Sequence, residues 1–279
     1  MRRLNINPSV DVLIPTRHRP SALAMTLMSL STQTVNPLRI VISDQSEPTI
    51  LLNPELTGLL RYLRHTGCSV DTHHHLPLRG MAEQRAFLLD QVRAPCCLFL
   101  DDDVITEPDL IERLHQVLCE QQCGFVGSAL HGLSFIDDER PHQQSIEFWE
   151  ERVTPELVRL HTQRWQRHHL HSAANLLHVQ QKTLHATTGT KLYKVAWVGG
   201  CVMFNTAKLR DCKAFDFWRE LPPEHCGEDV LAQLRVMAGY GGCAIYPSGA
   251  YHLELPTSLP VREINAPQVL THWLPQGIA

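Results

Sequence analysis

The chain has 279 residues, with 25 Lys and Arg against 29 Asp and Glu, which gives a formal net charge of −4. Its content of 43% hydrophobic and 19% charged residues excludes a disordered chain, and the near balance of charge argues against a general nucleic-acid-binding protein, which needs a basic face. No segment approaches the ~18 consecutive apolar residues of a membrane-spanning helix, and no apolar run follows the basic first residues as in a signal peptide. We therefore expect a cytoplasmic protein.

The first hundred residues alternate between apolar runs and segments with apolar residues at helical spacing. The apolar runs predict strands at 10–14, 39–43 and 96–100, and a weaker strand within 61–72. The helical spacing predicts helices over 21–31 and 81–92. Because strand, helix and strand follow one another as in a βαβ unit, we expect a largely parallel sheet covered by helices.

The pattern continues less regularly beyond residue 104. Thr106 to Asp109 has the spacing of a capping box with an early proline, which predicts a helix start. The remaining expected elements are a strand at 124–130, helices around 145–151 and 155–170, a loop at 187–190, a strand over 192–204 broken by two glycines, a helix over 228–238 that ends at Gly239, and a strand at 243–246.

Three adjacent acids, Asp101, Asp102 and Asp103, directly follow the wholly apolar strand at 96–100. Open α/β sheets bind ligands at the carboxyl ends of their strands, and Mg²⁺ or Mn²⁺ takes carboxylate and phosphate oxygens. Since alternate residues of an extended chain point to opposite sides, Asp101 and Asp103 are predicted to share one side and Asp102 to face the other. The alternative interpretation is a solvated acidic turn before the next helix.

Three further features could belong to a site. Glu228 and Asp229 begin a predicted helix, where acids are either catalytic or simply favoured by the helix dipole. His252 is either a structural residue or a metal ligand. The pair Gly199-Gly200 either makes a turn or lets a ligand approach the backbone.

Taken together and in this order, the motifs resemble the GT-A glycosyltransferases of family 2. The residues that carry the resemblance are Val12–Arg17, Ile40–Asp44, Arg79–Arg85, Phe99–Asp103, Gly199-Gly200, Gly227–Asp229 and His252, so it covers about residues 10–255. The turn Ser43–Ser46 departs from the commoner family sequence, and the Trp-containing segment of processive members is not evident, which argues against a polymerising synthase.

The resemblance implies an α/β fold of the GT-A type, a Rossmann-like sandwich with a mostly parallel central sheet flanked by helices. It implies one domain over 1–279, with a nucleotide-sugar-binding half at 1–104, an acceptor-side half at 105–255 that contains a helical insert at about 131–190, and a C-terminal tail at 256–279. The implied activity is metal-dependent, inverting transfer of a sugar, with a UDP-sugar as the expected donor. The expected acceptor is a hydroxyl of a glycan, a lipid-linked molecule or another compound. Peripheral association with the inner face of a membrane is a further expectation.

The resemblance also implies a role for each matching residue. Asp229, with Glu228 beside it, is implied as the catalytic base, and Asp103 as the ligand of Mn²⁺ or Mg²⁺ with His252 as a further ligand. The implied nucleotide-sugar-binding residues are Pro15, Thr16, Arg17, Asp44, Arg79, Asp101, Asp102, Gly199 and Gly200, the two glycines lining the sugar or acceptor pocket.

Two other functions compete with this interpretation. A nucleotidyltransferase should carry a glycine-rich loop after its first strand, and residues 15–20 contain no glycine. A non-catalytic sugar-binding protein need not retain the acid triplet, the Glu228-Asp229 pair and His252. Of the 17 histidines, eight fall within 131–190, where they would make the acceptor side more cationic below neutral pH and suit an anionic acceptor.

Overall fold

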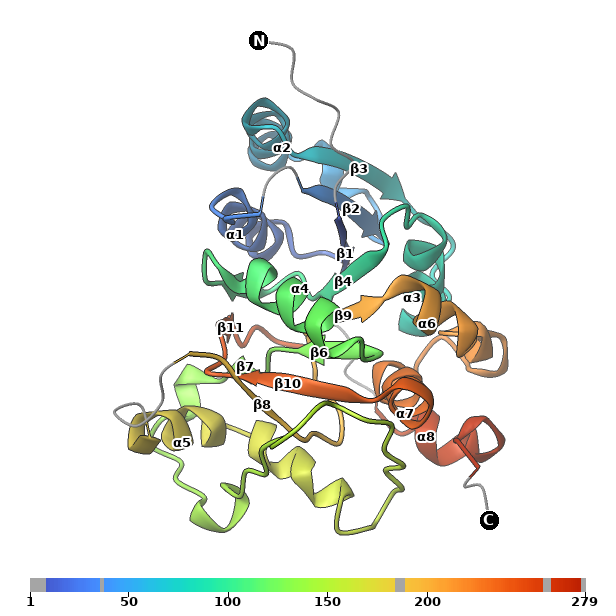
Figure 1. Cartoon of the computed structure of the whole chain (residues 1–279). Coiled ribbons are helices and arrows are strands. Elements are labelled where there is room, and N and C mark those ends of the chain that lie inside the picture. The colour runs from blue at the N-terminus through green and yellow to red at the C-terminus, as the bar shows by residue number, and fades with distance from the viewer. Residues whose placement is uncertain (1–8, 36–37, 184–188, 258–261, 277–279) are drawn as a thin grey trace.

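The computed structural model describes residues 9–35, 38–183, 189–257 and 262–276. A central sheet runs through this part of the chain, and helices cover both of its faces (Figure 1). The sheet has eight strands in the order β3-β2-β1-β4-β9-β6-β10-β8. In chain order, these strands are β1 (Val10–Thr16), β2 (Arg39–Asp44), β3 (Ser69–His74), β4 (Cys96–Leu100), β6 (Phe125–Gly127), β8 (Lys191–Tyr193), β9 (Cys201–Asn205) and β10 (Gly242–Tyr246).

Strand β1 lies inside the sheet and is buried along its whole length. It pairs in parallel with β2 on one side and with β4 on the other. β3 and β10 also join parallel partners, whereas β8 and β9 run antiparallel to theirs. The mostly parallel α/β sheet is thus as predicted. Because β1 and β4 run the same way, Thr16 and Asp101 come to the same edge of the sheet.

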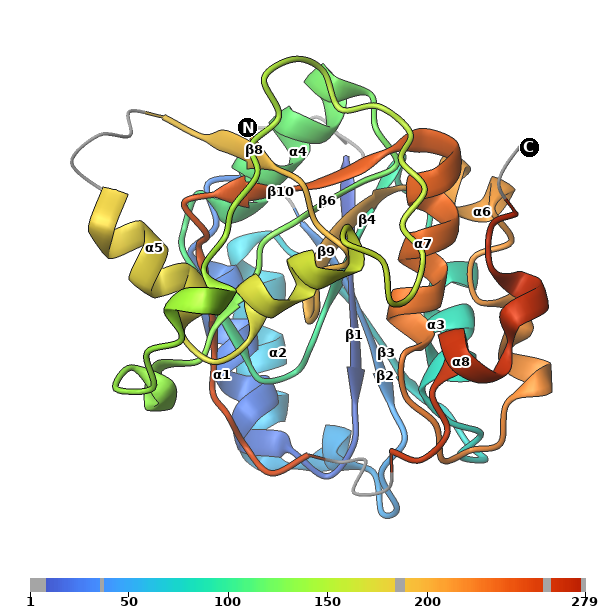
Figure 2. The same ribbon diagram turned by 90° about the horizontal axis from the view of Figure 1, so that it is seen from below.

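The helices form two layers with separate apolar cores. Helices α1 (Pro20–Ser31), α2 (Pro54–Thr66) and α4 (Leu110–Gln121) cover one face, and α3 (Met81–Asp90), α6 (Thr206–Asp211) and α7 (Glu228–Tyr240) cover the other, as Figure 2 shows with β1 between them. Outside these layers lie α5 (Asn175–Thr183), α8 (Ala266–Val269) and the 3₁₀ segments Ile50–Leu52, Leu133–Phe135, Pro141–Gln143, Trp165–His171, Asp216–Glu220 and Thr271–Trp273.

A second, small sheet places His252 beside the acid triplet. Its strand order is β5 (Val104–Thr106), β11 (Ala250–His252) and β7 (Leu130–His131). In the antiparallel register of β11 and β5, His252 lies opposite Val104, and the next amide along, that of Leu253, donates to the carbonyl of Asp103 at 2.9 Å. No sequence pattern predicted this sheet.

The regular strands and helices of the first hundred residues are confirmed except at 61–72. There α2 continues to Thr66, because Leu56, Leu60 and Leu63 form its buried stripe, and β3 starts only at Ser69. The predicted capping box at 106–109 is also wrong. Thr106 ends β5, and its hydroxyl accepts a hydrogen bond from Gln33 Nε2 at 3.1 Å instead of capping α4, which begins at Leu110.

The predictions for 131–190 are the least accurate. No helix forms at 145–151, where Phe148 makes an isolated bridge to Tyr193. Within 155–170 only the 3₁₀ segment that begins at Trp165 is helical, and α5 was not predicted. Thr187 and Thr188 of the expected loop lie outside the described residues.

Several later boundaries also differ. The strand expected at 124–130 is two strands, β6 and β7, in different sheets, and the one expected at 192–204 is β8 and β9. Helix α7 passes through Gly239 and ends at Tyr240, followed by Gly241 with φ of 75°.

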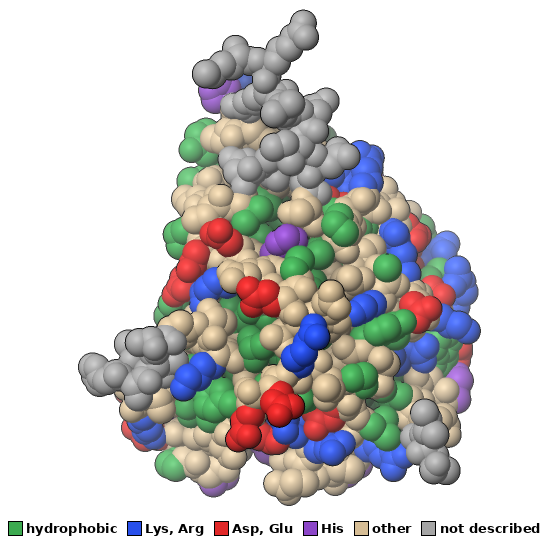
Figure 3. Space-filling view, viewed as in Figure 1, with side chains coloured by type: hydrophobic (Ala, Val, Ile, Leu, Met, Phe, Trp, Pro, Cys, Tyr) green, Lys and Arg blue, Asp and Glu red, His purple; other side chains and the backbone are tan. Residues whose placement is uncertain are grey.

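None of the helices in the described ranges has the length and apolar character needed to cross a bilayer. On the face of the molecule in Figure 3, basic and acidic side chains are interspersed, as the balanced composition predicts.

Candidate active site

A cleft of about 1260 Å³ opens at the carboxyl ends of β1 and β4. Its walls come from the residues after these strands, the starts of α3 and α7, the Gly199-Gly200 turn and the segment after β11. Most of the residues that the sequence predicted for the site line this cleft, namely Pro15, Thr16, Arg17, Asp101, Asp102, Asp103, Gly199, Gly200, Glu228, Asp229 and His252.

The three acids after β4 do not follow the predicted alternation. The chain turns at residues 102–103, so the extended geometry on which the prediction depends is absent. Asp102 and Asp103 both contact Nη1 of Arg19, at 3.3 and 2.7 Å, whereas Asp101 accepts a hydrogen bond from Arg85 at 3.2 Å. Asp102 and Asp103 therefore share a cation, and Asp101 faces a different one.

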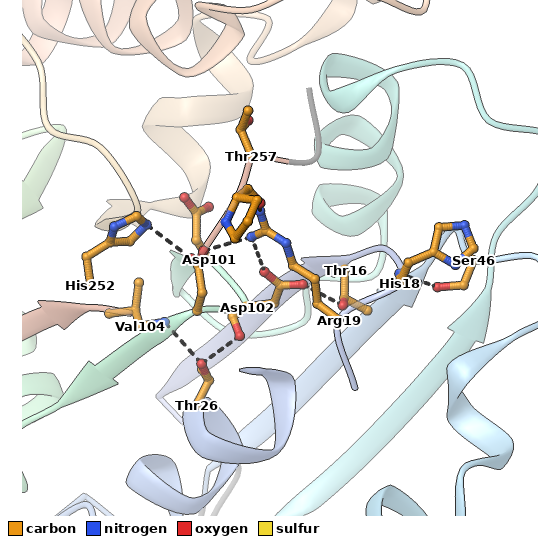
Figure 4. A network of polar contacts seen from close by, with 12 residues as sticks. Thr16, His18, Arg19, Thr26, Ser46, Asp101, Asp102, Val104, His252 and Thr257 are labelled. Carbon is orange, nitrogen blue, oxygen red and sulfur yellow. Dashed lines mark hydrogen bonds and ion pairs between the residues drawn. The ribbon is translucent and has the colours of Figure 1, made fainter. Parts of the chain in front are cut away.

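Two threonines fix this turn from neighbouring elements. The hydroxyl of Thr16, at the end of β1, donates to Asp102 Oδ2 at 2.6 Å. The hydroxyl of Thr26, inside α1, donates to the carbonyl of Asp102 at 2.9 Å and accepts from the amide of Val104 at 3.1 Å (Figure 4). The position of the carboxylates is therefore set by buried hydrogen bonds to β1 and α1.

The carboxyl groups of the triplet differ in acidity. Burial raises the pKa of Asp101, and it raises the pKa of Asp102 to about 6. Burial also acts to raise the pKa of Asp103, but the hydrogen bond and charge of His252, together with Arg19, outweigh it and lower that pKa. The same hydrogen bond raises the pKa of His252. Asp103 is thus the most persistent anion of the three.

A second acidic group lies at the start of α7. Glu228 Oε1 accepts a hydrogen bond at 3.0 Å from Nε of Arg85, a residue of α3 that is 6% exposed. The same guanidinium reaches Asp101, so it joins the two acidic groups. Burial first, and then the charge of Glu228, raise the pKa of the neighbouring Asp229 to about 7. Asp229 is therefore a carboxylate that can exchange a proton near neutral pH.

His225 connects the loop before α7 to the start of α3. Its fully buried ring accepts the amide of Ala82 at Nε2, 3.0 Å away, and donates from Nδ1 to the carbonyl of Pro222 at 2.6 Å. Gly80, with φ of 99°, lies against this ring, where a Cβ would be only 2.5 Å from a ring carbon. This contact fixes Glu228 and Asp229 relative to Arg85.

Three residues of the site were not predicted from the sequence: Arg19, Arg85 and His225. Arg85 ends the segment Arg79–Arg85 that carries part of the resemblance, but the resemblance assigns nucleotide-sugar binding to Arg79. No comparable sequence signal marks Arg19 or His225.

Two predicted residues do not line the cleft. Asp44 is fully buried, and its carboxylate accepts hydrogen bonds from the amides of Ser46 and Ile50 and the hydroxyl of Thr49, so it shapes the turn after β2. Arg79 is exposed, with its guanidinium 5.9 Å from the ring of Trp218. Their neighbours Gln45 and Gly80 line the cleft in their place.

Asp103 and His252 are the residues best placed to bind a divalent cation. His252 Nε2 lies 3.4 Å from Asp103 Oδ1. Among the described residues, no group of three or more His, Cys, Asp or Glu is arranged to hold a metal ion. One carboxylate and one imidazole fit an Mn²⁺ or Mg²⁺ ion whose other ligands come from substrate phosphates and water.

The histidines of 131–190 do not form one cationic face. Burial lowers the pKa of His131 and of His171 to about 4, so both stay neutral in mildly acidic solution. Burial, and then the charge of His168, also lower the pKa of His169. The expectation that this whole segment becomes cationic below neutral pH is therefore wrong for these residues, and His185 lies outside the described part of the chain.

The sequence model of one family, described as Glycosyl transferase family 2, matches residues 11–183. The chain belongs to this family. The predicted family is thus confirmed. No curated protein sequence matches the chain.

Several solved structures resemble this member of glycosyl transferase family 2. S. aureus TarS 1–349 in complex with UDP-GlcNAc is 13% identical with a TM-score of 0.55, over 90% of this chain and 60% of that one. The mannosyltransferase PcManGT from Pyrobaculum calidifontis, in complex with GDP-Man and Mn²⁺, is 14% identical with a TM-score of 0.55, over 91% of this chain and 59% of that one. A longer S. aureus TarS structure is 16% identical with a TM-score of 0.54, over 88% of this chain and 36% of that one. At these identities the likeness shows the fold, which is the predicted GT-A type, and the chain spans only 36% to 60% of the three structures.

Proposed function

We propose that this protein transfers a sugar from a nucleotide-diphosphate sugar to a hydroxyl of an acceptor. The observation that carries the proposal is the meeting of two acidic groups in one cleft, the turn at 101–103 and the pair Glu228-Asp229. Membership of glycosyl transferase family 2 supports it. The nucleotide sugars bound in two similar structures, UDP-GlcNAc and GDP-Man, support a donor of this chemical class.

Residues after β1 and β2 are proposed to bind the nucleobase and ribose. Arg17 Nε and Gln45 Nε2 are buried, line the cleft and have no hydrogen-bond partner in the described part of the chain. Buried donors are almost always paired, so a nucleobase that presents carbonyl oxygens would satisfy them. Uracil and guanine both do so, and a UDP-sugar stays the expected donor.

Asp103 and His252 are proposed to bind Mn²⁺ or Mg²⁺ together with the diphosphate. The ion would neutralise the charge that develops on the leaving nucleoside diphosphate. Asp103 suits this role because its lowered pKa keeps it ionised. Titrating Mn²⁺ with a nucleotide present should show weaker binding to Asp103→Ala than to the wild-type protein, and equal binding would exclude Asp103 as a ligand.

Asp229 is proposed as the base that takes the proton of the acceptor hydroxyl. The base must lie within ~3 Å of that hydroxyl, and Asp229 lines the cleft with a pKa near neutral. Glu228 is held by Arg85, so it orients the helix start instead of exchanging the proton. Attack by the deprotonated hydroxyl in one displacement would invert the configuration at the anomeric carbon.

The acceptor is proposed to enter beside Gly199, Gly200 and Trp197, which line the cleft on the acceptor-side half. The Nε1 atom of Trp197 is buried without a hydrogen-bond partner in the described residues, and its ring is partly exposed. An indole face of this kind suits the apolar face of a sugar. We also propose that residues 1–104 form the donor half and 105–255 the acceptor half, since residues of both ranges line the cleft. A lipid-linked acceptor would require peripheral contact of the protein with a membrane.

Thermal denaturation with a panel of UDP- and GDP-sugars, each with and without Mn²⁺, tests the proposal. A donor that binds only the native state raises the melting temperature. Release of free UDP or GDP from the stabilising donor in the presence of Mn²⁺ would then show turnover. If no nucleotide sugar stabilises the protein, the proposed function is wrong.

A further inference from the structure

The guanidinium of Arg19 lies directly on the acid turn. Nη1 is 2.7 Å from Asp103 Oδ2 and 3.3 Å from Asp102 Oδ1, and the other terminal nitrogen, Nη2, donates to the carbonyl of Pro256. The side chain is 17% exposed, and it lines the cleft. One cation therefore neutralises two carboxylates of the site and also holds the segment that follows β11.

This placement conflicts with a divalent cation on the same carboxylate. Asp103 contacts His252 through Oδ1 and Arg19 through Oδ2, so a cation bound to Asp103 would lie close to the guanidinium. Like charges repel strongly in a partly buried site, where the effective dielectric constant is lower than in water. The guanidinium and a bound divalent cation cannot share Asp103 without a large cost.

The acid turn does not need Arg19 to keep its shape. Asp102 is held independently by the hydroxyls of Thr16 and Thr26, at 2.6 and 2.9 Å. The backbone carbonyl of Asp103 accepts the amide of Leu253 at 2.9 Å. Arg19 can therefore leave its carboxylates without loss of the turn, as an exchangeable cation must.

The buried Arg85 provides the contrast. Its side chain is 7% exposed, lies 5.6 Å from the ring of Phe99, and binds Asp101 and Glu228 on two different elements. A residue placed in this way fixes elements together. Arg19 instead is the residue directly before α1, and its side chain is more open to the cleft, so it can turn towards a ligand.

We propose that Arg19 couples the binding of the divalent cation to the binding of the donor. Without a donor, its guanidinium neutralises Asp102 and Asp103. When a cation binds to Asp103, the guanidinium moves to the diphosphate of the donor, which a planar, two-pronged cation binds well. This inference rests on the proposed function, and it makes each ligand dependent on the other because the coupling between two sites is reciprocal.

Titration calorimetry on the full chain tests the coupling, with Mn²⁺, UDP and GDP as probes. Affinity for Mn²⁺ is measured alone and with saturating nucleotide, and affinity for each nucleotide with and without Mn²⁺. In the wild-type protein, the nucleotide that binds should tighten Mn²⁺ binding by about 10-fold or more, within the usual range of coupling between sites. Arg19→Met should bind Mn²⁺ alone about 10-fold more tightly than wild type, and the coupling should fall by about the same factor, to the part that direct contact between Mn²⁺ and the phosphates supplies.

Two matched variants separate this role from a general effect of charge. Arg262→Met removes the same charge from the same cleft, but Arg262 donates to Thr257 and not to the acid turn, so the coupling should be retained. Arg19→Lys keeps the charge and loses the planar fork, so it should still oppose Mn²⁺ but couple it less strongly to the nucleotide. If Arg19→Met does not fold, Arg19→Lys carries the test.

The outcomes are distinct. If Arg19→Met, or failing it Arg19→Lys, shows wild-type affinity for Mn²⁺ and wild-type coupling, the inference on Arg19 is overturned while the proposed function stands. The inference is also overturned if Arg262→Met lowers the coupling as much as Arg19→Met does. If neither UDP nor GDP binds the wild-type protein, with or without Mn²⁺, the proposed function fails and this inference fails with it.

Discussion

Replacement of Asp229 by asparagine should have two effects of opposite sign, slower sugar transfer and a more stable protein. Burial, and then the charge of Glu228, raise the pKa of Asp229 from 3.8 to about 7. At about 1.4 kcal/mol for each pH unit, the ionised carboxylate costs the folded state up to about 4 kcal/mol. Because the side chain is partly open to the cleft, solvent screening should reduce this penalty to about 2 kcal/mol.

The pH dependence follows from the direction of this shift. Well below pH 3.8, Asp229 is protonated in both the folded and the unfolded state, so it costs nothing. The penalty grows as the pH rises from 3.8 to about 7 and is constant above that range. Asparagine, which does not ionise, should therefore raise the free energy of unfolding by about 2 kcal/mol at pH 8 and by almost nothing at pH 4. Urea denaturation at both pH values measures the difference.

The rate of transfer gives the second half of the test. Loss of a general base should lower kcat by about 10²- to 10⁴-fold and leave donor affinity unchanged. Transfer at the wild-type rate would exclude Asp229 as the base. Equal stability of the two proteins at pH 8 would show that the carboxylate is well solvated, and the argument from burial would then be wrong.

Three further substitutions test the surroundings of Asp229. Glu228→Gln should lower the free energy of unfolding by about 3 kcal/mol in urea denaturation, because the buried Arg85 loses a charged partner, and an unchanged value would refute that pairing. His225→Phe should lower kcat by about 10-fold and leave donor affinity unchanged, since a positioning residue acts through geometry. His225→Asn should recover part of the rate. Equal rates in the wild-type protein and both variants would exclude a positioning role for His225. Trp197→Ala should raise KM for the acceptor about 10-fold in initial-rate measurements and leave donor binding as it is, whereas an unchanged KM would place the acceptor elsewhere.

Local patterns predicted the fold of the first hundred residues well. The apolar run at Cys96–Leu100 is wholly buried because both faces of β4 are covered, and a strand of this kind is recognised in a sequence by its continuous run of apolar residues. The acids at 101–103 directly follow that strand, and ligands bind at the carboxyl ends of strands in such sheets, so the location of these acids in the cleft was predictable. The spacing of apolar residues likewise identified α1 and α3.

Contacts between distant residues were not predictable in the same way. Arg19 and Asp103 are 84 residues apart, and Arg85 and Glu228 are 143 residues apart. With 25 Lys and Arg against 29 Asp and Glu, no local rule selects one partner for a given charge. The sheet of β5, β11 and β7 is hidden for a related reason, because strands of two or three residues leave too short a pattern to read.

The distribution of charge around Arg85 explains why Asp229 can take up a proton near neutral pH. Asp101, Glu228 and Asp229 lie close enough to raise one another's energy when ionised, and the only guanidinium bound to Glu228 among the described residues is that of Arg85. Its two hydrogen bonds go to Asp101 and Glu228, and the charges of these partners outweigh burial and raise the pKa of Arg85. Asp229 instead accepts a hydrogen bond from the amide of Val230, and no guanidinium in the described part of the chain binds it. One cation shared between two acids thus leaves the third poised to take up a proton, as a base for an acceptor hydroxyl must.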